Sequence, residues 1–208
     1  MSDYLNEEEQ LARLREWWQR HGVALLLGVV VVVAGVVGWR WYQGHLEERV
    51  AATSELFAEY RQADGERRST LARRIVDEGS GTAYPTFVRL VQARDAVAAG
   101  EPEEAQSLLR EAVDAATGAE LADLARVRLA RVLFAASDSD GALAVLQDVA
   151  SAGYRALTAE LKGDIHLARD QRARAHQSYT AARSYLASGE ERPVLEMKIA
   201  DTADASET

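Results

Sequence analysis

Cysteine is absent from the 208 residues, and histidine (4), proline (3) and methionine (2) are scarce. The lack of cysteine excludes disulfide frameworks, thiolate zinc sites and thiol catalysis. Four histidines leave little material for metal or acid–base chemistry, whereas the shortage of proline permits long helices. The 24 basic residues are outnumbered by 33 acidic ones, and the resulting charge of −9 argues against nucleic-acid binding, which needs a basic face. The composition favours an all-α protein without cofactors or metals.

A long uncharged run lies near the N-terminus. Residues 22–39 read GVALLLGVVVVVAGVVGW, which as a helix would span about 27 Å, close to the hydrocarbon core of a bilayer. Trp17 and Trp18 precede the run, and Trp39 and Trp41 close it. Such rings are typical of membrane interfaces. We therefore predict one transmembrane helix, because a core helix of a soluble protein is seldom apolar on all sides over this length.

The main alternative for this run is a cleavable signal peptide. The run is longer than the ~7–15 apolar residues usual in signal peptides, and it ends in Trp-Arg-Trp instead of small residues. An uncleaved signal-anchor is therefore favoured. Arg13, Arg15 and Arg20 precede the run, against Arg40 and Arg49 after it, which by a narrow margin predicts a cytoplasmic N-terminus.

Two pairs of small residues lie within the run. Ala24 with Gly28, and Ala34 with Gly38, stand four residues apart. Small residues at this spacing let a second transmembrane helix approach closely, which predicts a helix-packing face. Glycine and alanine are also common in membrane helices that have no partner, so both interpretations stay open.

The chain beyond residue 43 has the pattern of a helical repeat. Amphipathic stretches alternate with short breaks rich in glycine, aspartate and serine, which leaves no room for a sheet. Ala105, Ala142 and Ala175 lie 37 and 33 residues apart and have similar surroundings. The recurring neighbours are Leu109, Leu146 and Tyr179 four residues later, Ala93, Ala130 and Gly163 twelve residues earlier, and Val97, Phe134 and Leu167 eight residues earlier.

This pattern of small and large residues has a physical explanation. A small residue in each helix of a pair lets the helices cross closely, and the large residue one turn on fills the space beside the crossing. One pair cannot bury its apolar face alone, so successive pairs stack into a solenoid. We expect a further divergent pair over residues 46–64 and 66–78, and a closing helix over Val194–Ala200. The unit resembles the tetratricopeptide repeat, without its early tryptophan and late proline.

The resemblance to tetratricopeptide repeats also predicts a binding surface. In such solenoids the first helix of each pair lines the concave face, and the equivalent positions of the first two units hold an apolar strip beside two arginines. This arrangement fits an apolar peptide or helix whose carbonyls or carboxylates bind the guanidinium groups. Alternatively, the strip is filled from within, by the helix near 46–64 or by Val194–Ala200. The predicted partner groove consists of Phe87, Leu90, Arg94, Leu124, Val127, Arg131 and Leu157.

The order of several segments resembles the YfgM family, the ancillary subunit of the bacterial SecYEG translocon. These segments are RLREWW at 13–18, GWRWY at 38–42, LARV at 129–132 and LEMKI at 195–199. The resemblance implies a single-pass inner-membrane protein with a periplasmic C-terminal domain. It also implies association with SecYEG, with unfolded exported chains and with PpiD, a membrane-anchored chaperone of the prolyl-isomerase type. The implied role is to pass newly exported proteins to periplasmic chaperones.

No motif for catalysis occurs in the chain: it contains no Gly-rich phosphate loop, no H-E-x-x-H and no G-x-S-x-G. We therefore assign no catalytic residues and expect a non-enzymatic adaptor. Two alternatives are a membrane-tethered scaffold of a cell-envelope or division complex, and a regulator-binding role for the N-terminal segment. The predicted parts are a cytoplasmic segment (1–21), a transmembrane signal-anchor helix (22–42), a periplasmic tetratricopeptide-like domain (43–200) and a disordered acidic tail (201–208).

Overall fold

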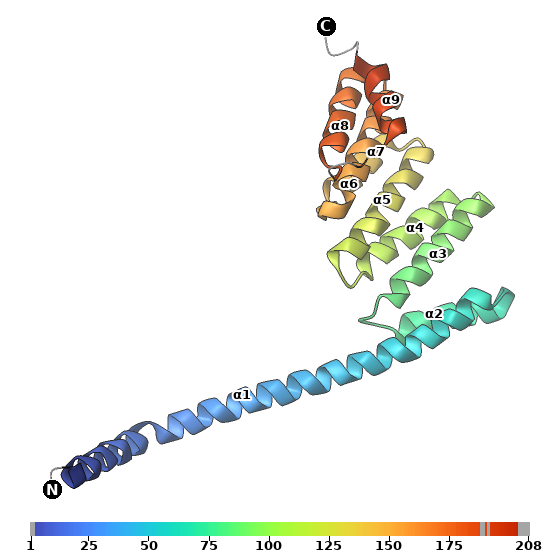
Figure 1. The fold of residues 1–208 in the computed structure, drawn as a ribbon. Helices are drawn as coiled ribbons and strands as arrows, with labels where there is room; N and C mark the ends of the chain where they lie inside the picture. The colour runs from blue at the N-terminus through green and yellow to red at the C-terminus, as the bar shows by residue number, and fades with distance from the viewer. Residues whose placement is uncertain (1–2, 188–189, 191, 204–208) are drawn as a thin grey trace. The chain divides into compact units, whose positions relative to one another are not determined.

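The computed structural model describes residues 3–187, 190 and 192–203, and their side chains except those of 3–14 and 24–25. This part of the chain is helical and contains no strand, so the predicted all-α class is confirmed (Figure 1). The elements are α1 (Asp3–Gln62), α2 (Gly65–Glu78), α3 (Tyr84–Ala99), α4 (Pro102–Asp114), α5 (Ala119–Ala135), α6 (Ser139–Gln147), the 3-10 helix η1 (Ala152–Tyr154), α7 (Arg155–Ala168), α8 (Arg172–Ser184) and α9 (Pro193–Thr202).

The chain divides into two compact units, residues 1–49 and 50–208. Within the first unit, α1 exposes its apolar side chains, among them Val31 and Trp41. The stretch Leu26–Gln62 includes a window long and apolar enough to cross a membrane, and none of that window is buried within the protein. In water such a surface would be costly, because each large apolar side chain gains about 1.5–3 kcal/mol on burial. The predicted single transmembrane helix therefore has a matching candidate in the structure.

Helix α1 continues without interruption from the first unit into the second. The sequence pattern treats the apolar run and the stretch 46–64 separately, whereas one helix covers both. Between them the chain has no proline and only one glycine, Gly44, and a lone glycine does not end a helix. The end of α1 packs on α2 and α3, where Tyr60, Ile75 and Val88 are buried together. This is the divergent pair that the sequence predicts before the repeats.

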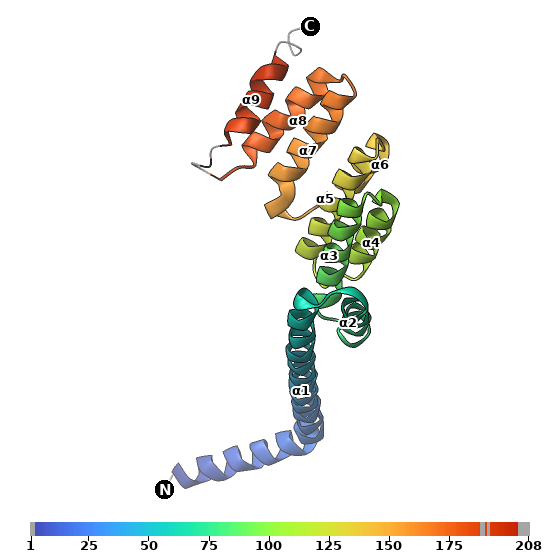
Figure 2. The same cartoon turned by 90° about the vertical axis from the view of Figure 1, so that its right-hand side faces the viewer.

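The second unit stacks its helices in chain order (Figure 2). Each pair of helices packs on itself and then on the following pair, from α3–α4 through α5–α6 to α7–α8. The three alanines that define the repeat, Ala105, Ala142 and Ala175, are all fully buried at these crossings. Leu109, Leu146 and Tyr179 are buried beside them. The repeat pattern read from the sequence is therefore the packing pattern of the fold.

The third repeat pair, α7–α8, which is called the third unit below, has a larger side chain on one helix and a smaller one opposite it on the other. Tyr179 stands where the other units have leucine, and Gly163 stands where they have alanine. A Cβ added at Gly163 would overlap the ring of Tyr179. The tyrosine hydroxyl donates a hydrogen bond to Asp164 at 2.8 Å. The pair Gly163–Tyr179 thus keeps α7 and α8 at the close crossing that Ala–Leu pairs provide elsewhere.

A buried carboxylate fixes the connection from the second repeat pair, α5–α6, to the third, α7–α8. Asp123 of α5 is 1% exposed and accepts hydrogen bonds from the backbone N–H groups of Ala150 and Ser151, at 3.1 and 2.8 Å. Arg126 donates to the same carboxylate at 2.8 Å. These bonds provide acceptors for two backbone N–H groups in the loop after the short helix α6, because those groups have no helical carbonyl to bind.

Helix α9 closes the C-terminal end of the repeat. Leu195 and Ile199 pack on Tyr179 and on the buried alanines of α8. The helix runs two residues beyond the predicted closing helix, to Thr202, which is fully buried. The remainder of the predicted acidic tail, residues 204–208, lies outside the described residues.

Candidate functional site

The predicted partner groove divides into covered and exposed positions. Leu90 and Val127 are 4% and 1% exposed and belong to the main core. Phe87, Leu124 and Leu157 are half-buried and pack against the same core. The two arginines of the set, Arg94 and Arg131, are exposed.

The N-terminal end of the strip is covered by the chain itself. The ring of Phe57, near the end of α1, lies 6.1 Å from that of Phe87 and 5.6 Å from that of Tyr84, centroid to centroid. Phe57 also stacks on Tyr60 at 5.9 Å. Such aromatic contacts add to the burial of the rings. Filling from within, which the sequence leaves open, therefore applies to Phe87.

An open groove remains between α3 and α5. Its volume is about 330 Å³, and most of its exposed lining is apolar. Leu90, Arg94 and Arg131, three members of the predicted set, line it. The other lining residues are Ala93, Val97, Leu109, Arg128 and Val132. The groove thus has an apolar floor and arginines on both walls, and none of its lining residues is acidic.

The three arginines differ in their partners. Arg94 donates to its neighbour Asp95 at 2.7 Å, and Asp95 also accepts from Arg68 at 2.7 Å. Burial alone would raise the pKa of Asp95, but the hydrogen bonds and charges of the two arginines hold it below its ordinary value. Arg128 and Arg131 form no hydrogen bond or ion pair with the described residues. The wall formed by α5 therefore presents two guanidinium groups without carboxylates.

Sequence reasoning missed several residues of this groove. Val97 occupies the repeat position that holds Phe134 and Leu167 in the other units, yet it is 51% exposed. Its exposure was not deducible from the repeat pattern, because the same position is half-buried in the other two units. Arg128 lies three residues before the predicted Arg131, a spacing that places both on one helix face. That spacing was the available signal for a second arginine.

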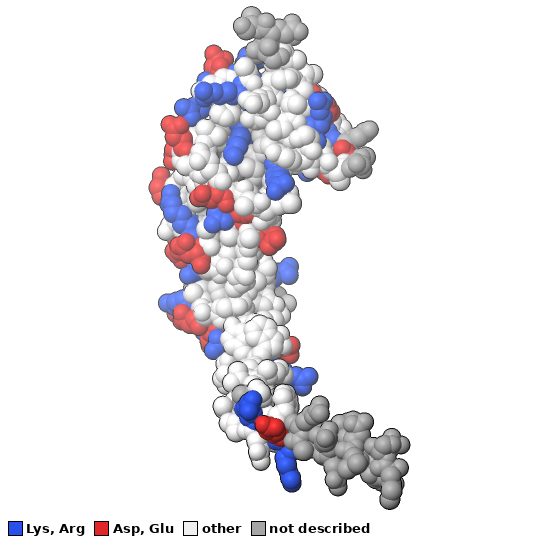
Figure 3. Space-filling view, turned by 90° about the vertical axis from the view of Figure 1, so that its left-hand side faces the viewer, with Lys and Arg blue, Asp and Glu red and all other residues white. Residues whose placement is uncertain are grey.

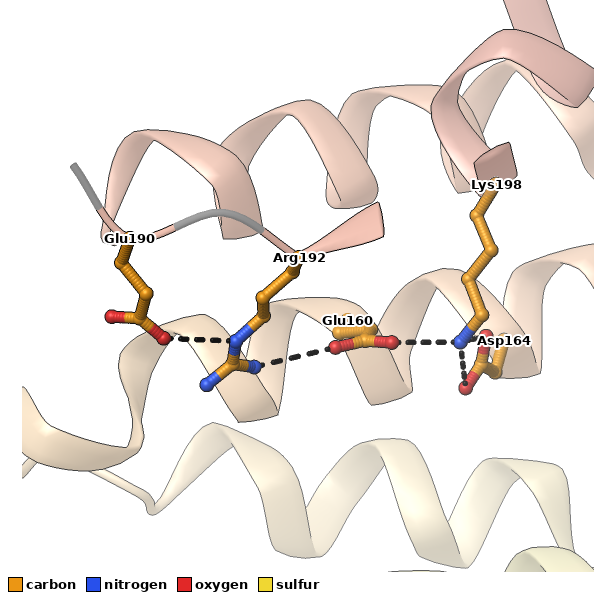
Figure 4. A network of polar contacts seen from close by, with 5 residues as sticks. All are labelled: Glu160, Asp164, Glu190, Arg192 and Lys198. Carbon is orange, nitrogen blue, oxygen red and sulfur yellow. Dashed lines mark hydrogen bonds and ion pairs between the residues drawn. The ribbon is translucent and has the colours of Figure 1, made fainter. Parts of the chain in front are cut away.

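The corresponding face of the third unit is closed by opposite charges. Glu160 and Asp164 of α7 stand at the repeat positions of Leu90 and Arg94, and Lys198 of α9 lies 2.8 Å from each carboxylate (Figure 4). Arg192 adds a 3.5 Å ion pair to Glu160. Burial alone would lower the pKa of Lys198, but the two carboxylates raise it above its ordinary value. Helix α9 thus covers the face that would otherwise be open.

Charges of both signs are scattered over the face drawn in Figure 3, without a large patch of one sign. No group of three or more His, Cys, Asp or Glu side chains among the described residues is arranged to hold a metal ion. The structure therefore directs attention to surface recognition by the groove between α3 and α5.

The predicted helix-packing residues lie on α1. Gly28, Ala34 and Gly38 are exposed, and the side chain of Ala24 lies outside the described residues. A Cβ added at Gly28 or Gly38 would meet no other atom of the chain within 4 Å. These positions are therefore accessible, and whether a second helix packs on them stays a prediction.

Comparison with known proteins agrees with this architecture. The profile of the family described as tetratricopeptide repeat-like domain matches residues 15–204. The chain belongs to this family. The match covers nearly all of the described residues, including much of α1 and the whole of the stacked repeat. No solved structure gives a significant match.

Two curated relatives are similar to part of the chain, and both are named ancillary SecYEG translocon subunit. The protein from Haemophilus influenzae is 28% identical over 99 residues, 46% of this chain and 48% of its own. The protein from Aggregatibacter actinomycetemcomitans is 26% identical over 103 residues, 47% of this chain and 49% of its own. The chain thus spans about half the length of the curated relatives it matches. These similarities and the repeat-like domain support the resemblance to the YfgM family and, together with the apolar helix, fit an inner-membrane protein.

Proposed function

We propose that the protein is a non-enzymatic, membrane-anchored adaptor of the SecYEG translocon that passes newly exported proteins to periplasmic chaperones. The observation that carries the proposal is the combination of two features in one chain. The exposed helix α1 carries an uncharged run of membrane-spanning length, and the same chain contains a tetratricopeptide-like unit with an open apolar groove. The name of both relatives, ancillary SecYEG translocon subunit, supports the translocon as the proposed partner.

The proposed topology follows from the sequence. Residues 1–21 lie in the cytoplasm, 22–42 cross the inner membrane, and the domain from 43 lies in the periplasm. Three arginines before the apolar run, against two after it, support this orientation. Protease added to spheroplasts should digest the repeat domain and leave the N-terminal segment intact. Digestion of the N-terminal segment alone would reverse the orientation.

The chaperone side of the proposal involves PpiD, which the YfgM resemblance implies. Purification of the full chain from gently solubilised membranes, followed by mass spectrometry, tests both partners. The adaptor proposal expects SecYEG subunits and a PpiD-type chaperone among the copurified proteins. Enrichment of envelope-synthesis or division proteins instead would favour the membrane-tethered scaffold.

Within the membrane, we assign partner contact to Ala24, Gly28, Ala34 and Gly38. Their small side chains let another helix approach, and packing is what associates helices in lipid. Replacing Gly28 and Gly38 by leucine should reduce copurification of the translocon. The matched control replaces Val30 and Val37, which are also exposed on α1, by leucine. Equal copurification by all variants would remove this contact from the proposal.

A further inference from the structure

Two corresponding places in the repeat carry opposite arrangements of charge. At the face of the third unit, the carboxylates of α7 meet the ammonium group of Lys198 on α9, and the space between the helices is closed. At the groove, Arg94 on α3 faces Arg128 and Arg131 on α5. Arg94 is already paired with Asp95, whereas the two guanidinium groups of α5 have no carboxylate partner among the described residues, so a carboxylate that enters the groove would be attracted to them.

The floor of the groove adds a second requirement. Leu90 and Val97 from α3, with Leu109 from α4, form an apolar surface between the arginine-bearing walls. Half of Val97 is exposed to solvent, so covering it is favourable. A groove of about 330 Å³ lies at the small end of the range for ligand pockets, which suits a few side chains of a partner.

We propose that the groove between α3 and α5 binds an acidic, amphipathic segment of a partner protein. One or two apolar side chains of the segment lie over Leu90 and Val97. Its carboxylates lie between Arg94 on one wall and Arg128 and Arg131 on the other, where each guanidinium group offers a planar pair of donors. This inference deepens the proposed function, since it rests on the groove as the binding surface of the adaptor.

The chain contains its own example of this mode of binding. Helix α9 attaches to the third unit through apolar anchors, Leu195 and Ile199, and through the charge of Lys198 on Glu160 and Asp164. At the groove the protein supplies the positive charge, so the incoming segment has to supply the negative one. An anionic lipid would meet the charge requirement but fits the apolar floor poorly, because its two acyl chains would extend beyond that short floor into water.

A peptide-binding experiment tests this inference on the full chain in nanodiscs of neutral lipid. The probe is a fluorescent helical peptide built on the repeat Leu-Glu-Glu-Leu-Leu-Glu-Glu, and its matched control has lysine in place of each glutamate. The groove variant carries R128E and R131E. The control variant carries R110E and R174E, which change the charge equally at exposed arginines outside the groove. Circular dichroism verifies that all proteins remain helical.

We expect the glutamate peptide to bind the native chain and the control variant, and the lysine peptide to bind neither. The groove variant should bind the glutamate peptide more weakly by a factor of about ten or more, and it should now bind the lysine peptide. Equal binding of both peptides by the native chain, or undiminished binding by the groove variant, would overturn the inference. The inference would also be overturned if the groove bound nanodiscs that contain phosphatidylglycerol in preference to the glutamate peptide.

The copurification experiment separates this inference from the proposed function. If translocon subunits copurify with the native chain but the glutamate peptide does not bind the groove, only the acidic segment is wrong. If the peptide binds as expected but no translocon subunit copurifies, the groove inference holds and the translocon assignment fails.

Discussion

Two surfaces have the same place in the repeat but differ in whether they are covered. The face between α7 and α9 is closed, whereas the groove between α3 and α5 is open. At the first, Lys198 joins two carboxylates and the apolar anchors of α9 are buried. At the second, arginines line both walls and Val97 is left exposed. The difference teaches that the size pattern of the repeat builds the solenoid, whereas the charges on its first helices decide which faces are available to a partner.

Reversing the charge that closes the third unit should have the largest effect. Lys198→Glu would bring a third carboxylate beside Glu160 and Asp164, and we expect a loss of about 3 kcal/mol in the free energy of unfolding. Hydrogen exchange should show α9 opening first. Lys162→Glu is the matched control, because Lys162 is the other lysine of the chain and forms no ion pair with the described residues. Similar, small losses in both variants would contradict the role of Lys198.

The crossing beneath that closed face should be the next most sensitive. Gly163→Ala places a methyl group against Tyr179 and should destabilise the domain by about 2 kcal/mol, as overpacking does. Adding Tyr179→Leu restores the Ala–Leu combination of the other units. The double variant should therefore lose less than the sum of the single losses in chemical denaturation. Simple additivity would show that the two residues do not compensate for each other.

Asp123 joins the open and the closed parts, because it sits on α5 and holds the loop that leads to α7. Burial alone would raise its pKa, but hydrogen bonds from Ser151, Arg126 and Ala150 hold the pKa below its ordinary value. The stability that Asp123 contributes is therefore fully present above the ordinary pKa of an aspartate and is lost as the pH falls through the lower pKa of the folded state. Asp123→Asn should cost about 1.5 kcal/mol at neutral pH and reduce this acid dependence. An unchanged pH profile would contradict the assignment.

A substitution in the open groove should change the free energy of unfolding least, and it should stabilise the protein where the other substitutions destabilise it. Arg131→Glu removes a repulsion from Arg94 and Arg128, so the free energy of unfolding should stay equal or rise by about 0.5 kcal/mol. Thermal unfolding of this variant beside Arg110→Glu measures the difference. A destabilisation comparable to that of Lys198→Glu would show that Arg131 has a structural role and that the groove is not a free surface.

Much of the fold was predictable because it depends on residue size at fixed spacing. The alanines at 105, 142 and 175 and the large residues four positions later identify the helix crossings from the sequence alone. The substitution of Gly163 for alanine, together with Tyr179 for leucine, is likewise visible as a matched change. The continuation of α1 into the repeat was not predicted, since the change in composition after the apolar run suggests a separate helix.

The candidate site was predictable only in part. Periodicity identifies the face of a helix but not what covers that face, and Phe87 is covered by Phe57, a residue thirty positions away on α1. Arg94 and Arg131 were identified because they recur at equivalent positions. Val97 was not, because its exposure depends on the space left between α3, α4 and α5, which the pattern within any one helix does not show.

Site-specific photocrosslinking in living cells tests the central claim most directly. A photoreactive amino acid at Val97, in the open groove, is compared with the same amino acid at Met197, which is also apolar and exposed but lies on α9. We predict adducts with a translocon subunit, a periplasmic chaperone or an exported chain at position 97, and none at position 197. Absence of such adducts at 97, or equal adducts at both positions, would contradict the account.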